Sequence, residues 1–321
     1  MRMGAAGLVL GVVAWSALGA PSRDAALAAG GERLLRVGIW LPGTVSLNLA
    51  DARVAIQVWA ERWGRKSGVF TGAEVQVFEV RPETIASQVA DPRWDAIFLP
   101  SEDFFATAER LGYVADYTIA RTDSPGDVYV LVVRRDGGIR EPVDLKGRRL
   151  IVANEHSSSC ALVWLNRLLA GKGAPGLPAL AASIVGETKA AKQILPVFFG
   201  QADACLVSRY EFEAMAELNP QVGRKLEILA TSPRLIPLVF SLGRGLNSRE
   251  REALQTSVRI AQGDPDFRQL LMLHRMRAFE PIDRAALDTT RELWEWGKSA
   301  GAPAKPARAD ARRPRGPGGE R

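Results

Sequence analysis

Apolar residues along the chain alternate between the spacing typical of strands and the spacing typical of helices. Residues 34–40 are rich in apolar side chains and predict a strand. A helical spacing follows, carried by Ala52, Ile56, Trp59 and Trp63. The same alternation predicts strands over residues 74–80, 96–99, 128–134, 150–153, 182–185, 202–207, 226–230 and 238–242, and helices over residues 82–90, 103–111, 160–170, 189–199 and 209–218.

This alternation favours an α/β fold, in which crossover connections build mainly parallel sheets with helices on both faces. Pro233 and Pro237 flank a segment expected to cross between two lobes. We therefore predict two α/β lobes joined by paired extended connections. The expected domains are residues 1–28 as a signal peptide, 29–134 as the first part of lobe 1, 135–235 as lobe 2, 236–300 as the return to lobe 1 with C-terminal helices, and 301–321 as a disordered basic tail.

The N-terminal segment has the pattern of a secretory signal peptide. A short basic start is followed by the small, apolar run from Ala5 to Ala14. Cleavage patterns occur at Ala17-Leu18-Gly19 and at Ala26-Leu27-Ala28, and an uncleaved anchor remains the alternative. No later stretch approaches the roughly 18 consecutive apolar residues of a membrane span. We therefore expect a periplasmic location.

Composition and charge argue against several other classes of protein. A hydrophobic content of 47% with 24% charged residues is typical of a soluble globular protein. Residues 301–321 hold six cations and two carboxylates, which leaves little of the net charge of +6 for the rest of the chain. Nucleic-acid binding is therefore not expected. Two histidines and two cysteines are also too few to suggest a metal site or a disulfide framework.

The run Ser157-Ser158-Ser159 lies between a predicted strand and a predicted helix. Ligands of open α/β sheets bind outside the carboxyl ends of the strands. A helix start offers unpaired N–H groups and a partial positive charge, and hydroxyls add further donors, so the chemistry suits an anion. The alternative, that one serine only caps the helix, remains open.

Connections of the second lobe offer further polar side chains. Lys189 opens a predicted helix, where its ammonium either reaches an anion or lies in solvent. Ser208 and Glu211 have the spacing of a capping box, which would occupy the serine without any ligand.

In the first lobe, Thr44, Ser101 and Glu102 follow predicted strands. Carboxylates at a helix start are stabilised by the helix dipole, so Glu102 requires no ligand to explain it. If Glu102 faces the ligand, its charge would repel a multiply charged anion. It would then favour a ligand that carries an amine or hydroxyl groups.

Catalysis has one candidate, Cys160, which lies four residues after His156. A thiolate at a helix start can act as a nucleophile. The chain lacks a Gly-x-Ser-x-Gly elbow, a phosphate-binding Gly-Lys-Thr/Ser loop and a His-Glu-x-x-His pattern. Pairing of Cys160 with Cys205 is a further alternative, since both belong to the second lobe.

Four segments carry a resemblance to a known family. They are DLKGRRLIV at 144–152, SSS at 157–159, VFFGQADAC at 197–205 and LATSP at 229–233. In order and spacing they resemble the phosphate/phosphonate-binding (PhnD-like) substrate-binding proteins of ABC transporters. The resemblance extends from about residue 34 to residue 296.

The resemblance implies a type II periplasmic-binding-protein fold, in which two α/β lobes with a hinge close on a small ligand in an interlobe cleft. It implies that Ser157, Ser158 and Ser159 bind the ligand's oxyanion, with no catalytic residue, metal ion or cofactor. The chain differs from the family at Glu102, where an aromatic residue is usual, and at Ser208, where an acidic residue is frequent.

We therefore expect a monomeric, exported solute-binding protein. It should capture a small anionic or zwitterionic solute, similar to phosphate or a phosphonate, for an ABC permease. Two alternatives remain open: presentation of the ligand to a membrane-bound sensor kinase or cyclase, and an enzyme that depends on Cys160.

Overall fold

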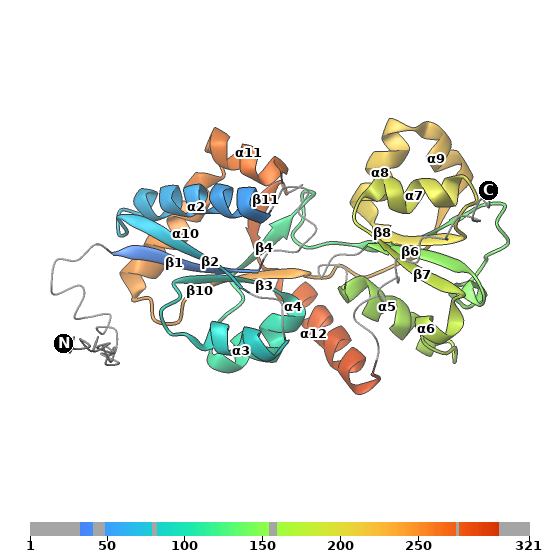
Figure 1. Ribbon diagram of the computed structural model, residues 1–321, viewed down its shortest axis with the longest axis horizontal. Coiled ribbons are helices and arrows are strands. Elements are labelled where there is room, and N and C mark those ends of the chain that lie inside the picture. The colour runs from blue at the N-terminus through green and yellow to red at the C-terminus, as the bar shows by residue number, and fades with distance from the viewer. Residues whose placement is uncertain (1–32, 41–48, 79–81, 154–158, 274–275, 302–321) are drawn as a thin grey trace, which may run out of the picture.

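The structure is a computed structural model that describes residues 33–40, 49–78, 82–153, 159–273 and 276–301. Two lobes lie side by side along its long axis, each with a central sheet between helices (Figure 1). The two-lobe α/β fold is therefore confirmed. The segments expected to be a signal peptide and a basic tail lie outside the described residues, except Gly301.

The first lobe has a six-stranded sheet built from both ends of the chain. Helices α2 (Leu49–Lys66) and α11 (Pro265–Leu273) cover one face of this sheet. Helix α10 (Ser248–Ala261) packs against α2. The other face carries α3 (Pro82–Ala90) and α4 (Ser101–Asp103) (Figure 1). The strands are β1 (Leu34–Ile39), β2 (Gly72–Val77), β3 (Ala96–Pro100), β4 (Tyr117–Ala120), β10 (Leu238–Leu242) and β11 (Ala278–Pro281), in the spatial order β11-β4-β10-β3-β1-β2.

The second lobe has a five-stranded sheet with a separate core on each face. One face packs on α5 (Ser159–Ala170) and α6 (Leu177–Leu180). The other packs on α7 (Ala190–Phe198), α8 (Arg209–Leu218) and α9 (Pro220–Lys225). The strands are β5 (Tyr129–Arg134), β6 (Arg149–Ala153), β7 (Ser183–Glu187), β8 (Ala204–Ser208) and β9 (Leu226–Thr231), in the order β7-β6-β8-β5-β9.

Both sheets follow one plan. Three parallel strands, β2-β1-β3 and β7-β6-β8, are followed by an antiparallel strand, β10 and β5 respectively. The expectation of mainly parallel sheets was therefore wrong, because the fourth strand enters from the other lobe and runs the opposite way. The expected lobe boundary at residue 134 falls at the end of β5, which pairs within the second sheet.

Two extended segments cross between the lobes, residues 121–128 and residues 232–237. Asp127 and Leu235 join them, each donating its N–H to the other's carbonyl at 2.8 Å. Asp127 is buried and pairs with Arg121 on the same segment. These backbone bonds tie the two crossings together, so the lobes are joined by a paired hinge.

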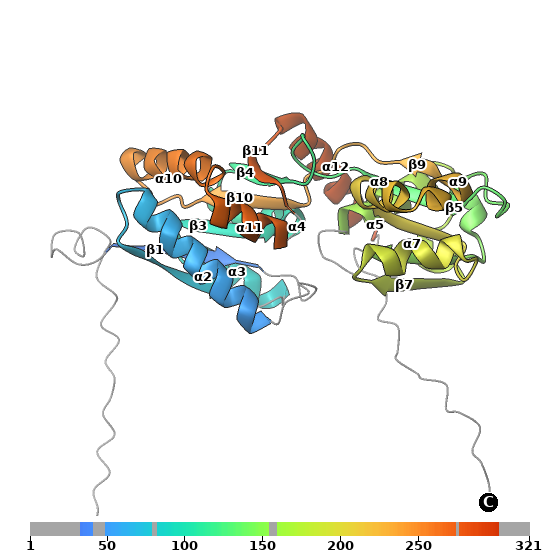
Figure 2. The ribbon, with the colours of Figure 1, turned by 90° about the horizontal axis from the view of Figure 1, so that it is seen from above.

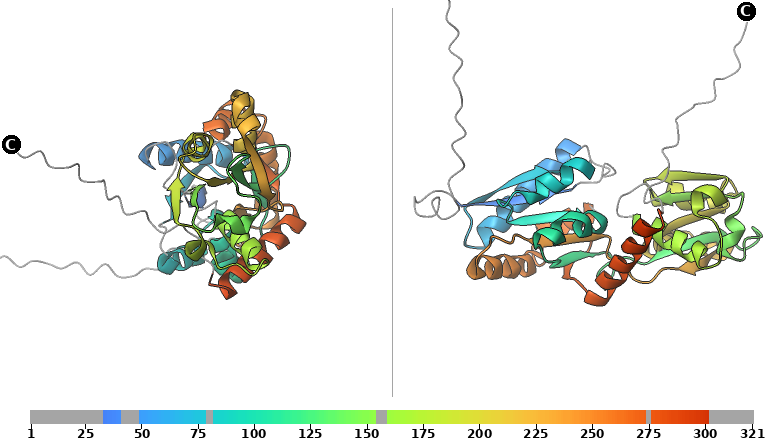
Figure 3. Two further views of the ribbon diagram at one scale, coloured as in Figure 1. Left: turned by 90° about the vertical axis from the view of Figure 1, so that its right-hand side faces the viewer. Right: turned by 90° about the horizontal axis from the view of Figure 1, so that it is seen from below.

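The last helix, α12 (Arg284–Ser299), packs against both lobes (Figure 3). Leu287 is buried in the core of the first lobe and Leu293 in the core of the second. Between them, the Thr290 hydroxyl accepts the Ile236 N–H of the hinge at 2.9 Å. This helix therefore braces the hinge from one side.

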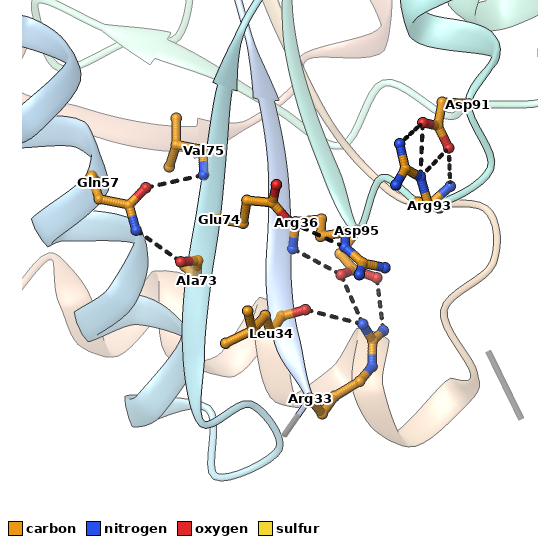
Figure 4. Close-up of polar contacts among 10 residues, drawn as sticks. All are labelled: Arg33, Leu34, Arg36, Gln57, Ala73, Glu74, Val75, Asp91, Arg93 and Asp95. Carbon is orange, nitrogen blue, oxygen red and sulfur yellow. Dashed lines mark hydrogen bonds and ion pairs between the residues drawn. The ribbon is translucent and has the colours of Figure 1, made fainter. Parts of the chain in front are cut away.

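A buried ion pair fixes the amino-terminal edge of the first sheet. The Asp95 carboxylate, fully buried just before β3, accepts from the two terminal nitrogens of Arg33 at 3.1 and 2.8 Å. It also accepts the Arg36 N–H at 2.9 Å (Figure 4). Nearby, the Gln57 amide joins α2 to β2. The carboxylate therefore holds the start of β1 to the start of β3.

Candidate ligand-binding site

The first of the predicted site residues to consider is Ser101, which directly follows β3 and is buried. Its N–H donates to the Pro237 carbonyl at 3.1 Å, and its hydroxyl donates to the Ile236 carbonyl. Ser101 thus attaches the start of α4 to the second crossing segment. This contact places the next residue, the half-buried Glu102, beside the hinge.

Ser208 lies at the end of β8, opposite Tyr129 at the start of β5, and is also buried. Its hydroxyl oxygen accepts the Glu211 N–H at 3.2 Å and lies 3.1 Å from a Glu211 carboxylate oxygen. The prediction that Ser208 caps this helix is confirmed. This hydrogen bond engages the Ser208 hydroxyl without any ligand, as expected from the spacing of Ser208 and Glu211.

Ser159 is the first residue of α5 and is buried. Cys160 follows it, and its environment indicates what surrounds the start of the helix. Burial, together with the charges of Glu102 and, more weakly, Asp127, raises the pKa of the Cys160 thiol to about 12. Because Coulomb effects of this kind act over short distances, Glu102 of the first lobe and Asp127 of the hinge lie near the start of α5.

The other predicted site residues are either outside the described residues or exposed to solvent. Thr44, Ser157 and Ser158 lie outside the described residues. Lys189 immediately precedes α7, is exposed and makes no side-chain cap. The structure thus brings Ser101, Glu102, Ser159 and Ser208 to the hinge side of the two sheets.

Sequence reasoning missed Asp127, a buried carboxylate of the hinge. No periodicity marks its position, since it lies between strands. Its burial arises from the pairing of residue 127 with residue 235, which are far apart in the sequence. Only the tertiary structure could reveal it.

The two cysteines are free, so the disulfide alternative was wrong. Cys160 packs with the core on the α5 side of the second sheet, and Cys205 is buried in the core on the other side. The sheet itself separates them, because alternate residues of a strand point to opposite faces. Burial also raises the pKa of the Cys205 thiol.

Within the described ranges, no three His, Cys, Asp or Glu side chains gather in a way that could hold a metal ion. In the same part of the chain, no helix combines the length and apolar character needed to cross a membrane.

Two α/β lobes with the same strand plan, joined by paired crossings, define a class of protein. This is the fold of the two-lobe periplasmic binding proteins. The family model described as the periplasmic substrate-binding protein of phosphonate ABC transporters matches residues 69–287. The chain therefore belongs to this family.

Solved structures with the same fold are distant in sequence. A Xanthomonas citri protein bound to ATP has a TM-score of 0.60 at 16% identity, covering 84% of this chain and 98% of that chain. PhnD1 of Prochlorococcus marinus, in complex with methylphosphonate, has a TM-score of 0.56 at 12% identity, covering 84% and 99%. The binding component of a phosphonate ABC transporter from Pseudomonas aeruginosa also has a TM-score of 0.56, at 13% identity, covering 84% and 88%. No curated protein matches the sequence.

Proposed function

We propose that the protein captures a small anionic or zwitterionic solute between its lobes and delivers it to an ABC permease. The observation that supports this most directly is the start of α5, where buried Ser159 lies near the hinge and near Glu102 of the opposite lobe. The free N–H groups and the dipole of a helix start favour an anion. Membership of the family supports the same conclusion.

We assign the oxyanion contacts to Ser159 together with its sequence neighbours Ser157 and Ser158. Glu102, Thr44 and Lys189 are proposed as polar groups around the ligand. Ser101 and Ser208, which bond to the hinge backbone and to the start of α8, hold their turns in position. In this proposal they shape the site without donating to the ligand.

The charges near α5 also limit the net charge of the proposed ligand. Arg121 pairs with Asp127 of the hinge, whereas the Glu102 carboxylate adds negative charge near α5, which disfavours a dianion. We therefore propose an oxyanion, such as a phosphate or phosphonate group, that carries a single charge or has an ammonium or hydroxyl group close by. Two proteins of the same fold were solved with phosphorus oxyanions, methylphosphonate and ATP.

The first test is a thermal-shift panel of phosphate, phosphite, methylphosphonate, 2-aminoethylphosphonate and ATP. A ligand at 100 times its Kd should raise the free energy of unfolding by about 2.7 kcal/mol. No shift with any member of the panel would contradict the proposal.

Variants then locate the binding site. Ser159→Ala should weaken binding of the best ligand by about 1–3 kcal/mol in free energy, because a buried ligand oxygen loses a hydrogen-bond donor. Ser183→Ala, at the amino end of β7, is the matched control and should have no effect. Glu102→Gln should favour dianionic phosphate relative to the parent protein. Equal affinities in all three variants would place the ligand elsewhere.

An enzyme that depends on Cys160 has less support. A thiol with a pKa of about 12 is protonated at neutral pH, whereas a nucleophilic cysteine needs its thiolate. Turnover of any bound ligand that is lost in Cys160→Ala would reverse this preference.

We also propose export to the periplasm through the N-terminal segment. Family membership supports this address. Mass spectrometry of the protein recovered from a periplasmic fraction should show a chain shortened at one of the two cleavage patterns. A full-length chain in the membrane fraction would indicate an uncleaved anchor instead.

A further inference from the structure

The second lobe has one end that points away from the first lobe (Figure 2). β5 runs from the hinge to this end, and β6, β7, β8 and β9 all begin there. We call it the far end of the second lobe, and it comprises residues 134–149, 171–183, 199–204 and 219–227. None of these residues belongs to the candidate ligand-binding site, which lies at the opposite end of the same sheet.

The far end carries more cations than carboxylates. Its nine cations are Arg134, Arg135, Arg140, Lys146, Arg148, Arg149, Lys172, Arg224 and Lys225. Its five carboxylates are Asp136, Glu141, Asp144, Asp203 and Glu227. The other described residues of the lobe, from β5 to β9, are balanced, with four cations and four carboxylates. The excess positive charge of the lobe is therefore concentrated at one end.

Ion pairs within the far end do not remove this excess, because two carboxylates are each shared by two arginines. The pairs are Arg148 and Arg149 with Asp203, and Arg135 and Arg140 with Glu227. The side chains of these arginines are 40–70% exposed. Each guanidinium has five N–H donors, more than these contacts use, so donors remain for the oxygens of an anionic partner.

An exposed aromatic ring lies among these cations. Phe199, directly after α7, is 65% exposed. The carbonyl of the next residue, Gly200, accepts from Arg149 at 3.3 Å. On the other side, the Lys225 ammonium lies 4.7 Å from the ring centroid of Phe198, which meets the Phe199 ring edge-on at 5.0 Å. A single exposed apolar side chain is ordinary, but this one is flanked by cations.

The spread of the charges favours an extended partner over a small anion. Neighbouring strands of a sheet lie about 4.8 Å apart, so the cations between β6 and β9 extend over about 15 Å. A small anion would use one or two of these cations, whereas a layer of anionic lipid headgroups meets them together. Each cation near such a layer raises affinity about fivefold. Aromatic rings among cations are also typical of surfaces that enter the headgroup region.

We propose that the far end of the second lobe docks on a membrane surface that contains anionic phospholipids. Its lysines and arginines face the phosphate groups, and the Phe199 ring enters the headgroup region. The proposed solute site near the hinge stays uncovered, because it lies at the other end of the sheet. This interaction goes beyond the proposed function and does not depend on the identity of the solute.

Sedimentation with vesicles tests the partner. The protein should bind vesicles of phosphatidylcholine and phosphatidylglycerol in equal parts at least about tenfold more tightly than vesicles of phosphatidylcholine alone. This preference should disappear at about 1 M salt, where the Debye length falls to about 3 Å. Equal binding to the two kinds of vesicle at low salt, or binding to neither, would overturn the proposal.

A pair of charge reversals tests the location. Arg224 in the last turn of α9 and Lys192 in the first turn of α7 are both exposed cations of the second lobe, but only Arg224 belongs to the far end. Arg224→Glu should weaken binding to the anionic vesicles at least about fivefold. Lys192→Glu, which changes the net charge equally, should weaken it about twofold or less. The basic residues 301–321 are present in both variants, so they do not contribute to the difference. Equal affinities in the two variants would refute the far end as the docking surface.

A second pair of variants tests the aromatic ring. Phe199→Ala should weaken binding to the anionic vesicles at least about threefold, because the ring leaves water on docking. Met272→Ala is the matched control, since Met272 of α11 is 68% exposed but lies on the first lobe. An unchanged affinity in Phe199→Ala would contradict membrane docking and indicate a soluble acidic partner instead. The best ligand of the anion panel should bind Arg224→Glu normally, so failure of either proposal leaves the other standing.

Discussion

Replacement of Asp95 by alanine should be among the most destabilising single changes in the first lobe. The carboxylate is fully buried and accepts hydrogen bonds from both terminal nitrogens of Arg33 and from the Arg36 N–H. Asp95→Ala removes the carboxylate that accepts from both terminal nitrogens of Arg33. Arg33 would keep a long contact of 3.4 Å with Glu250, a hydrogen bond of 3.1 Å to the Leu34 carbonyl and its position over the Phe70 ring.

Two effects set the size of the loss. Breaking a buried ion pair by removing one partner costs about 3–5 kcal/mol. Leaving the Arg36 N–H without its acceptor adds about 1–3 kcal/mol. Arg33 is 13% exposed and retains Glu250, so water and that carboxylate offset part of the penalty. We expect a net loss of about 3–4 kcal/mol in the free energy of unfolding, a large share of the roughly 5–15 kcal/mol typical of a domain.

Urea unfolding of four proteins measures this loss: the parent, Asp95→Ala, Arg33→Ala and the double variant. The double variant should be less destabilised than the sum of the single variants, because neither Arg33 nor Asp95 is left without the other, with a coupling energy of about 0.5–3 kcal/mol. Arg93→Ala is the matched control, since Arg93 and Asp91 form a nearby ion pair whose arginine is 55% exposed (Figure 4). It should cost about 0–1 kcal/mol.

Equal losses in Asp95→Ala and Arg93→Ala would refute the reasoning, because burial is the property that distinguishes the two pairs. Additive losses in the double variant would show that Arg33 and Asp95 do not depend on each other.

Three further predictions concern other buried or partly buried groups. Iodoacetamide at pH 8, followed by mass spectrometry, should leave Cys160 and Cys205 unmodified until urea unfolds the protein, because burial raises the pKa of both thiols; rapid labelling of the folded protein would contradict this. Burial raises the pKa of Asp116 above 3.8, so its contribution to stability is full below pH 3.8 and falls as pH rises through the raised value. Asp116→Asn should remove that fall in urea unfolding followed against pH, and an unchanged pH profile would be the contrary result. Gly297→Leu should cost about 1–3 kcal/mol in the same assay, since a Cβ at Gly297 would lie 2.6 Å from Val163 of α5; parent-like stability would show that α12 and α5 adjust freely.

The sequence predicted helices and strands well where the apolar spacing extends over the whole element. The strand at 238–242 and the helices at 82–90 and 209–218 have the predicted bounds. The Ser208 cap followed from the spacing to Glu211, because capping is a local interaction between neighbours in the chain.

The missed elements depend on partners distant in the sequence. β4 and β11 are four-residue strands that pair with each other, and their short runs carry no clear alternation. The single helix expected over 103–111 is instead a succession of π-helical and 3-10 turns after α4. Apolar spacing over so few residues does not distinguish these turns from an α-helix.

For the site, too, local features could be predicted and contacts between residues distant in the sequence could not. Strand-to-helix turns located Ser101, Ser159 and Ser208, because such turns follow from local periodicity. The contact of Ser101 with Ile236 and the burial of Asp127 could not be predicted, because both require the crossing segments to meet.

The position of β10 has a consequence for how the chain acquires its structure. β10 lies between β3 and β4, so these two strands have no neighbour in common until residue 242 has been made. The sheet containing β5 to β9, in contrast, needs only residues 129–231. During vectorial synthesis or translocation, the middle of the polypeptide can therefore mature first, while the early segment waits for its late partner and depends on protection from aggregation.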